Sequence, residues 1–292
     1  EIVAGGLLWK SAGLYKMPNK DWVRGYYAQC RTCSRFYTEL ELALIPSTCE
    51  ECLDPILPRR YLKPAFGFVS EIKTAKPTSA PPERSWNGDT YFVGSTQPLN
   101  EVIDFETGKG VKWKLLRGEQ QKLMSISSGI GNSGFHICEF CGRGLPASQG
   151  NPPAKHKSPW TDKECKGKTI HASLMHQFET DVLALEIQEF TRDINRYWSL
   201  LYAILEGAAN SLQISRDDIS GTLSFSHGKI TLILFDTVPA GAGCVLQIGQ
   251  EFAKVVDAAW HKVMNCECGP ETSCYSCLRS YQNQIRHDKL SR

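Results

Sequence analysis

Cysteines at metal-ligand spacing are the feature of this 292-residue chain that points most directly to chemistry. Eleven of the twelve cysteines fall into three tight groups, and only Cys244 stands apart. Paired CxxC turns offer thiolates to Zn²⁺, which binds four ligands tetrahedrally. The spacing therefore predicts three zinc ions as the cofactors of this chain.

The first and last groups each supply four thiolates. The first joins two CxxC turns at zinc-ribbon spacing, and the last compresses its ligands into a short segment near the C-terminus. The predicted ligands are Cys30, Cys33, Cys49 and Cys52, and Cys266, Cys268, Cys274 and Cys277.

The middle group supplies three thiolates, Cys138, Cys141 and Cys165, and needs a fourth ligand. His156 and His171 are both candidates. We favour His156 because it lies in a long Pro-, Gly- and Lys-rich loop between the CxxC turn and Cys165, where a metal ion would supply an internal tie.

A disulfide framework is the rival interpretation of an even number of cysteines. Disulfide scaffolds are usually short and cysteine-dense throughout, whereas these cysteines cluster in a long chain. The first residues have no basic segment ahead of an apolar core, and no stretch is apolar enough to span a membrane. We therefore expect a reducing, cytoplasmic location.

Basic residues gather locally although the formal net charge is only +2. Residues 143–168 contain six Lys or Arg against two Asp or Glu. Lysine and arginine contact phosphates, and flat rings stack on unpaired bases. The candidate nucleic-acid contacts are Arg143, Lys155, Lys157, Trp160, Arg279, Arg286 and Lys289. The alternative is that the C-terminal tyrosines pack against the zinc cluster and that Arg279 balances thiolate charge.

These residues must be positioned by strands and helices whose patterns differ along the chain. Alternating residues around the first CxxC turn and strand-like runs from 90 to 127 predict strand-rich zinc-ribbon modules. Residues 181–187 predict a half-buried strand, 198–212 an amphipathic helix and 230–235 a strand buried on both faces. A glycine turn and one further helix follow.

This pattern predicts an α+β chain in which zinc-ribbon modules precede a mixed α/β domain with a C-terminal four-cysteine cluster. PTSAPP at 77–82 is the clearest linker. We expect domains at 1–80, 81–172 and 173–292. The opening segment is typical of the middle of a domain, so we also expect a piece of a longer protein.

The glycine turn 239–243 after the buried strand invites a phosphate-binding interpretation, because free amides at a helix N-terminus bind anions. The turn lacks the P-loop and dinucleotide motifs, and close packing of the glycines is the favoured interpretation. Glu206, Asp217, Asp218 and Asp236 are the acidic residues that a nuclease-like site would use.

The last hundred or so residues resemble the MZB zinc-binding domain found at the C-terminus of bacterial superfamily-2 helicases, including Mrf-type repair helicases, and in subunits of phage-defence systems such as DISARM. The resemblance rests on four segments in the right order: HQFETDVLALEI (176–187), WSLLYAILEGAANSLQISRDDISG (198–221), LILFDTVPAGAG (232–243) and the cysteine-rich segment 266–292. Upstream, YLKPAFGFVSEI (61–72) and SSGIGNSGFHICEFCGRG (127–144) resemble the region that precedes this domain in those helicases, so the resemblance runs from about Trp22 to the end. Ala240 departs from the glycine expected in the turn.

The resemblance implies zinc ligation by the last four cysteines and a superfamily-2 helicase motor as partner, in the same chain or a separate subunit. The ATPase motifs are absent, so no enzymatic activity is expected of this segment. We expect an accessory zinc-binding region of a DNA helicase or of a defence or repair complex, which provides a DNA or partner surface. A purely structural docking module is the alternative, and a nuclease-like enzyme is a third.

Overall fold

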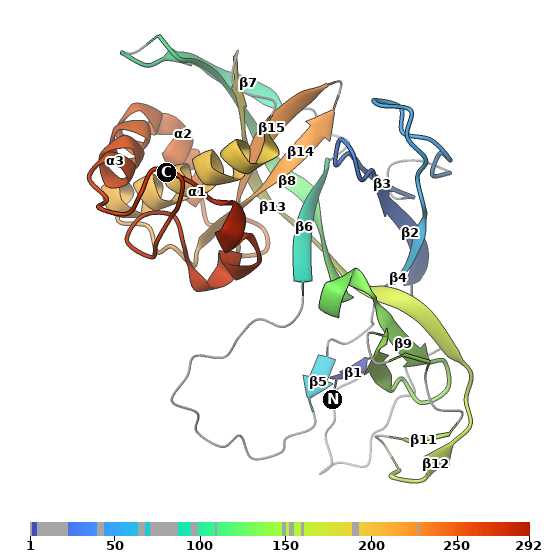
Figure 1. Cartoon of the computed structure of the whole chain (residues 1–292). Helices are drawn as coiled ribbons and strands as arrows, with labels where there is room; N and C mark the ends of the chain where they lie inside the picture. The colour runs from blue at the N-terminus through green and yellow to red at the C-terminus, as the bar shows by residue number, and fades with distance from the viewer. Residues whose placement is uncertain are drawn as a thin grey trace, which may run out of the picture.

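The computed structural model describes residues 2–4, 23–39, 44–63, 68–70, 87–94, 99–108, 110–147, 150–151, 155–158, 161–188, 193–226 and 228–292. The expected linker at 77–82 and Trp160 lie outside these residues. The described elements form an α+β fold, as the sequence predicts, with one large mixed sheet and helices gathered on one side of it (Figure 1).

The large sheet has eleven strands, and it includes strands from all three of the expected segments. Its strands are β2 (Val23–Gln29), β3 (Phe36–Thr38), β4 (Arg59–Lys63), β6 (Asn87–Gly94), β7 (Asn100–Glu106), β8 (Lys112–Gly129), β9 (Phe135–Cys138), β10 (Gly144–Pro146), β13 (Thr169–Ile187), β14 (Ile219–Ser226) and β15 (Lys229–Asp236). Two further pairs stand apart, β1 (Ile2–Ala4) with β5 (Phe68–Ser70) and β11 (His156–Lys157) with β12 (Glu164–Cys165).

The long strand β13 connects the parts of this sheet. Its first residues pair antiparallel with β9 and parallel with β4, and its remainder pairs antiparallel with β8 and β15. Strand β8 carries β7 along its first half and β6 along its second. The sheet thus places the zinc-binding segments and the helical part of the chain along a single pair of long strands.

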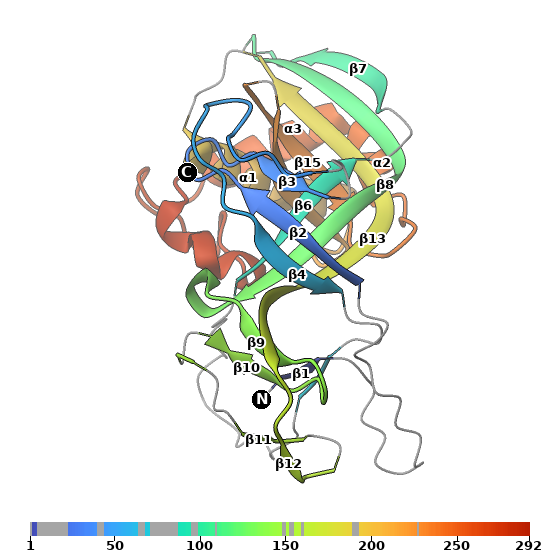
Figure 2. The same ribbon diagram turned by 90° about the vertical axis from the view of Figure 1, so that its right-hand side faces the viewer.

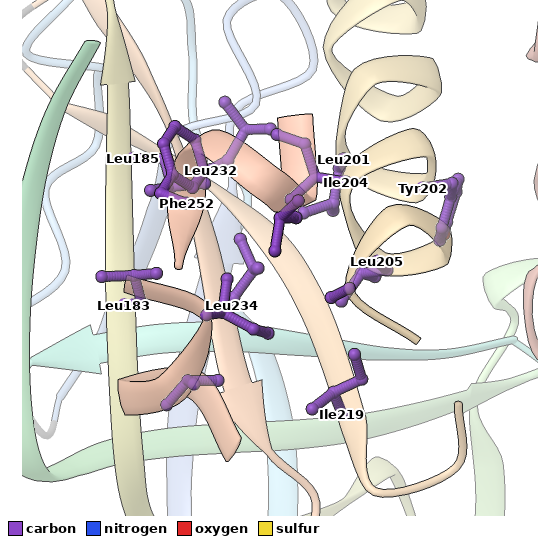
Figure 3. Close-up of a cluster of buried hydrophobic side chains, with 14 of the residues drawn as sticks. Leu183, Leu185, Leu201, Tyr202, Ile204, Leu205, Ile219, Leu232, Leu234 and Phe252 are labelled. Atoms are coloured by element: carbon purple, nitrogen blue, oxygen red, sulfur yellow. The ribbon is translucent and has the colours of Figure 1, made fainter. Parts of the chain in front are cut away.

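Helices α1 (Ile194–Leu212), α2 (Cys244–Gln250) and α3 (Phe252–Met264) cover one face of the sheet. Figure 3 shows the resulting core, in which Leu201 and Leu205 of α1 face Leu232 and Leu234 of β15. Apolar residues at helical spacing bury such a stripe because removing them from water is favourable. The predicted amphipathic helix is therefore confirmed.

Two expectations about these elements need correction. The strand expected at 181–187 begins at Thr169 and is not half-buried, because Leu183 and Leu185 face the helical core while Val182 and Ala184 enter a second core on the opposite face. The single helix expected after the glycine turn divides into α2 and α3 at Glu251, whose backbone (φ −106°, ψ 27°) leaves the helical region. The strand at 230–235 is buried on both faces, as predicted.

The short 3₁₀ segments η2 (Ile130–Asn132) and η4 (Tyr281–Lys289) follow β8 and the last cysteines, respectively. Figure 2 shows β9, β10, β11 and β12 projecting from the sheet at the end away from β7. Within the described residues, no helix is long and apolar enough to cross a membrane.

Candidate zinc and nucleic-acid sites

The first cluster joins Cys30, Cys33, Cys49 and Cys52 through two backbone turns. In each turn the amide of the residue after the second cysteine donates to the carbonyl of the first, Ser34 to Cys30 (3.1 Å) and Leu53 to Cys49 (2.9 Å). Ser34 and Leu53 both adopt φ 63°, a left-handed conformation that ordinarily favours glycine. The turns hold the sulfurs of Cys30 and Cys52, and of Cys33 and Cys49, 3.4 Å apart.

Tyr37 contacts this cluster through its hydroxyl group, and the cysteine spacing alone did not predict this contact. Its hydroxyl lies 3.2 Å from the Cys49 sulfur and accepts a hydrogen bond from the Glu50 amide at 3.0 Å. Burial opposes ionisation of the Cys49 thiol, but the hydrogen bonds from Tyr37 and the following amides lower its pKa to about 6. Burial raises the pKa of the neighbouring ligand Cys33, so these contacts favour the thiolate at Cys49 rather than at every ligand of the cluster.

The middle cluster brings His156 together with Cys138, Cys141 and Cys165. Strand β9 ends at Cys138, and the pairing of β11 with β12 sets His156 directly opposite Cys165. The His156 Nε2 lies 3.1 Å from the Cys141 sulfur, and all four side chains are buried. His171 lies elsewhere, with its Nε2 against the Ser133 carbonyl oxygen, so the favoured histidine is the one at the cluster.

The last cluster lies between the C-terminal end of α3 and η4. The sulfur of Cys266 is 3.4 Å from those of Cys268 and Cys274, and that of Cys277 is 3.7 Å from Cys268. Cys277 and Leu278 belong to the helical core. Arg292 closes this region, because its guanidinium donates to the carbonyl oxygens of Val263 and Cys266 at the end of α3.

These arrangements fit zinc and do not fit disulfides. All ligand atoms within each cluster lie within 4.8 Å of one another. Zn–S bonds of about 2.3 Å in a tetrahedron give sulfur separations of about 3.8 Å, whereas a disulfide needs about 2.05 Å. All twelve cysteines are free. Three ligand sets that suit zinc are therefore present, as the spacing predicts.

The basic candidates of the middle segment surround its cluster. Lys155 and Lys157 are exposed, as are Lys163, Lys166 and Lys168. The Arg143 guanidinium donates to the Lys157 carbonyl oxygen at 2.8 Å and fixes the loop that carries His156. Lys155 and Lys157 form ion pairs with Glu164 (3.3 Å) and Asp162 (3.9 Å). Ion pairs this exposed contribute at most about 1 kcal/mol and exchange readily for other anions.

The basic candidates near the C-terminus have different surroundings. Arg279 donates to the Ser273 hydroxyl and to the His287 carbonyl oxygen rather than to the thiolates. Arg286 forms an ion pair with Asp89 at 2.7 Å, and its guanidinium lies 3.8 Å from the centre of the Trp198 ring. Only Lys289 is exposed. Arg286 joins the C-terminal segment to the sheet through Asp89, and Arg279 holds that segment together, so any phosphate would have to compete with these contacts.

The acidic residues do not gather into a metal-ligand group within the described residues, where the three cysteine clusters are the only such groups found. Glu206 forms ion pairs with Arg216 and Lys262, and Asp217 accepts a hydrogen bond from Gln282. Asp236 is fully buried. The amides of Ala242, Cys244 and Val245 all donate to its carboxylate, at 2.6, 3.2 and 2.9 Å.

The N-terminus of α2 is therefore already occupied by a carboxylate from its own chain, so the turn 239–243 has an internal anion. Gly241 (φ 83°) packs against Asp181, as the close-packing interpretation expects. The interpretation is wrong for Gly243, because nothing lies within 4 Å of a β-carbon there, and its φ of 79° is what favours glycine. Ala240 adopts φ 71°, which explains why glycine is the expected residue there. Cys244 is partly buried and packs against the helical core, and burial raises the pKa of its thiol.

Comparison with known proteins places these features in a family context. Residues 200–278, from α1 through the last cluster, match the family model described as the MrfA Zn-binding domain, MZB. A curated relative, Druantia protein DruE of Escherichia coli (strain UMEA 4076-1), is 28% identical over 239 residues, which cover 70% of this chain. The chain spans only 13% of the length of that relative.

Solved structures of the DUF1998 helicase MrfA are also similar. The match to the structure bound to DNA covers 71% of this chain and 25% of the MrfA chain, with 16% sequence identity and a TM-score of 0.36. The match to the structure bound to DNA and AMPPNP covers 67% of this chain and 21% of the MrfA chain, with 12% sequence identity and a TM-score of 0.29. The family match and the four cysteines that follow α3 agree: residues 200–278 of this chain are similar to the MrfA Zn-binding domain.

Proposed function

We propose that this chain is an accessory zinc-binding region of a DNA helicase, or of a helicase-containing defence or repair complex, and that its middle segment contacts nucleic acid. The motor would lie in the same polypeptide or in a partner subunit. The MZB match and the similarity to a Druantia protein support the helicase and defence association. Twelve free cysteines suit a reducing compartment, so we place the protein in the cytoplasm.

The main support for a nucleic-acid contact is the basic surface of residues 135–168. We call these residues the middle module. It carries five exposed lysines, Lys155, Lys157, Lys163, Lys166 and Lys168, and it projects from the sheet (Figure 2). The middle cluster ties the loops that carry them, because too little apolar core lies within this module to order them. A fixed set of cations on a projecting module can follow a phosphate backbone.

The experiment is a charge reversal of Lys155, Lys157 and Lys163 in the 292-residue chain. Phosphate contacts release counterions, and each contact contributes about 0.7–0.9 to the slope of log affinity against log salt concentration. The triple Glu variant should bind labelled DNA more weakly and show a slope smaller by about 2–3. A matched reversal of the exposed Lys112, Lys229 and Lys254 controls for net charge. Equal losses in both variants, or none, would overturn the assignment to the middle module.

A docking function has its own support in the first zinc-binding segment. Leu44, Leu53 and Leu57 are 79, 77 and 65% exposed, whereas the neighbouring Ile45 and Ile56 are buried against Tyr37. Exposed leucines on a zinc-held loop suit contact with a protein, here the helicase motor. If the charge reversal leaves DNA binding intact while Leu53→Ser with Leu57→Ser releases the motor, the structural docking function is the better description.

A further inference from the structure

A groove of about 320 Å³ opens where the first zinc-binding segment, the sheet and the C-terminal segment meet. Its walls come from β6, the first turns of α1, and η4, and β14 also lines it, while Gln29 and Ser34 contribute from the first segment. The volume is within the range of sites for small ligands or single nucleotides. It is separate from the middle module and contains none of the predicted zinc ligands, although Gln29 and Ser34 flank the first CxxC turn.

Three polar side chains that line the groove have no partner in the described part of the chain. The amides of Asn132 and Asn195 make no side-chain hydrogen bond there, and Lys289 makes no ion pair. Asn132 comes from η2, Asn195 from the first turn of α1 and Lys289 from the end of η4. The groove therefore offers two amides, each with donors and an acceptor, and one cation.

The remaining lining is held rigidly by aromatic and ionic contacts. The Tyr91 ring stacks on Phe36 with centroids 4.0 Å apart and planes 10° apart, and the Tyr91 hydroxyl donates to Gln29. Arg286 is fixed between Asp89 and Trp198. Because Arg286 and Asp89 neutralise each other, Lys289 gives the groove one net positive charge, as one phosphate requires.

We propose that this groove binds one unpaired nucleotide of a single-stranded nucleic acid. The base stacks on Tyr91, the amides of Asn132 and Asn195 hydrogen-bond to its edge, and Lys289 contacts its phosphate. The inference rests on the proposed nucleic-acid function and adds the form of the substrate at a second place on the molecule.

Chemistry separates this ligand from the alternatives. A duplex presents its bases only within its grooves, where a protruding element must reach them, whereas an unpaired base can enter a concave site lined by rings and amides. A peptide strand would add to the backbone edge of β6 or β14, each of which pairs with one neighbour in the described residues, and it would leave the side chains of Asn132, Asn195 and Lys289 unused.

The test uses two double variants. The groove variant combines Asn195→Ala and Lys289→Ala, and the control variant combines Asn210→Ala and Lys254→Ala. Both pairs remove one amide and one cation, and Asn210 lies on the same helix as Asn195 but is exposed at its other end. Affinities are measured by fluorescence anisotropy for a labelled twelve-nucleotide single strand and for the matching duplex. We expect the groove variant to bind the single strand about tenfold more weakly with a salt slope lower by about 0.7, and its duplex affinity to stay unchanged.

A second readout identifies the contact directly. A single strand that carries 5-iodouracil should crosslink under ultraviolet light to the peptide containing Tyr91, and the groove variant should lose this crosslink while its zinc content stays the same. If the wild-type chain binds single strands but the groove variant binds them equally and Tyr91 is not crosslinked, the groove inference is wrong. If the wild-type chain binds no nucleic acid at all, the proposed function fails instead.

Discussion

At the scale of single residues, the zinc clusters depend on close contacts that cysteine spacing does not reveal. Gly167 shows this at the middle cluster, where a β-carbon would lie 2.7 Å from both the Cys138 sulfur and the Phe140 β-carbon. Such a separation is far below van der Waals contact. The side chain at position 167 must therefore be absent for Cys138 to keep its position.

We accordingly expect Gly167→Ala to displace Cys138 and to remove the middle zinc ion, while the first and last clusters stay loaded. Loss of a structural zinc ion should also unfold the loops it ties, because metal binding and local folding are coupled. Zinc analysis of the purified variant should give one ion fewer than wild type. Gly108→Ala is the matched control, since nothing lies within 4 Å of a β-carbon there. Full zinc content in the Gly167 variant would contradict the account of this contact.

The sequence identified the thiolates by their spacing, but it could not decide the roles of residues whose partners are distant. His156 and His171 were both candidates, and the sequence favoured His156 only for its place in the loop, whereas the pairing of β11 with β12 sets it opposite Cys165. Arg286 looked like a phosphate contact because it is one of several cations near the C-terminus. Its ion-pair partner, Asp89, is 197 positions away, so no local pattern predicts it.

At the scale of elements, the junction between β15 and α2 depends on a buried acid. Asp236 ends β15 and accepts hydrogen bonds from three amides at the N-terminus of α2. Amides at a helix N-terminus have no partner within the helix and carry partial positive charge, so a carboxylate stabilises them.

Asp236→Ala should therefore lower the free energy of unfolding by about 2–4 kcal/mol, because buried amides lose a charged acceptor. The shift in the urea midpoint of the zinc-loaded chain measures this loss. Asp257→Ala on α3 provides the control, since its side chain is 73% exposed and its effect should stay within about 0.5 kcal/mol. A midpoint for the Asp236 variant equal to that of the control would show that the carboxylate is not the cap described.

Periodicity predicted the elements that bury a continuous apolar face and missed those that do not. Helix α1 and strand β15 carry regular patterns and were predicted correctly. The first half of β13 was not, because His171, His176, Gln177 and Glu179 interrupt its apolar pattern. Pairing with β9, β4 and β8 holds that half in the sheet, and pairing over such distances leaves no periodic signal in the sequence.

At the scale of the whole molecule, charged and apolar side chains are distributed differently over the zinc-binding segments. The middle module presents lysines, the first segment presents leucines, and the last cluster is joined to the helical core through Cys277 and Leu278. The expected domains at 1–80, 81–172 and 173–292 stay a prediction, and the eleven-stranded sheet draws strands from each. In this arrangement, zinc ions fix surfaces that have little core of their own and hold them on one sheet.

Three separate zinc ions are expected to organise this chain, and native mass spectrometry of the purified protein is the most direct measurement of them. We expect three zinc ions per chain and no disulfide, with Cys33→Ser, Cys141→Ser and Cys268→Ser each removing one ion without affecting the other two. Two or fewer zinc ions in the wild-type chain, or a mass lowered by disulfide formation among these cysteines, would contradict this expectation.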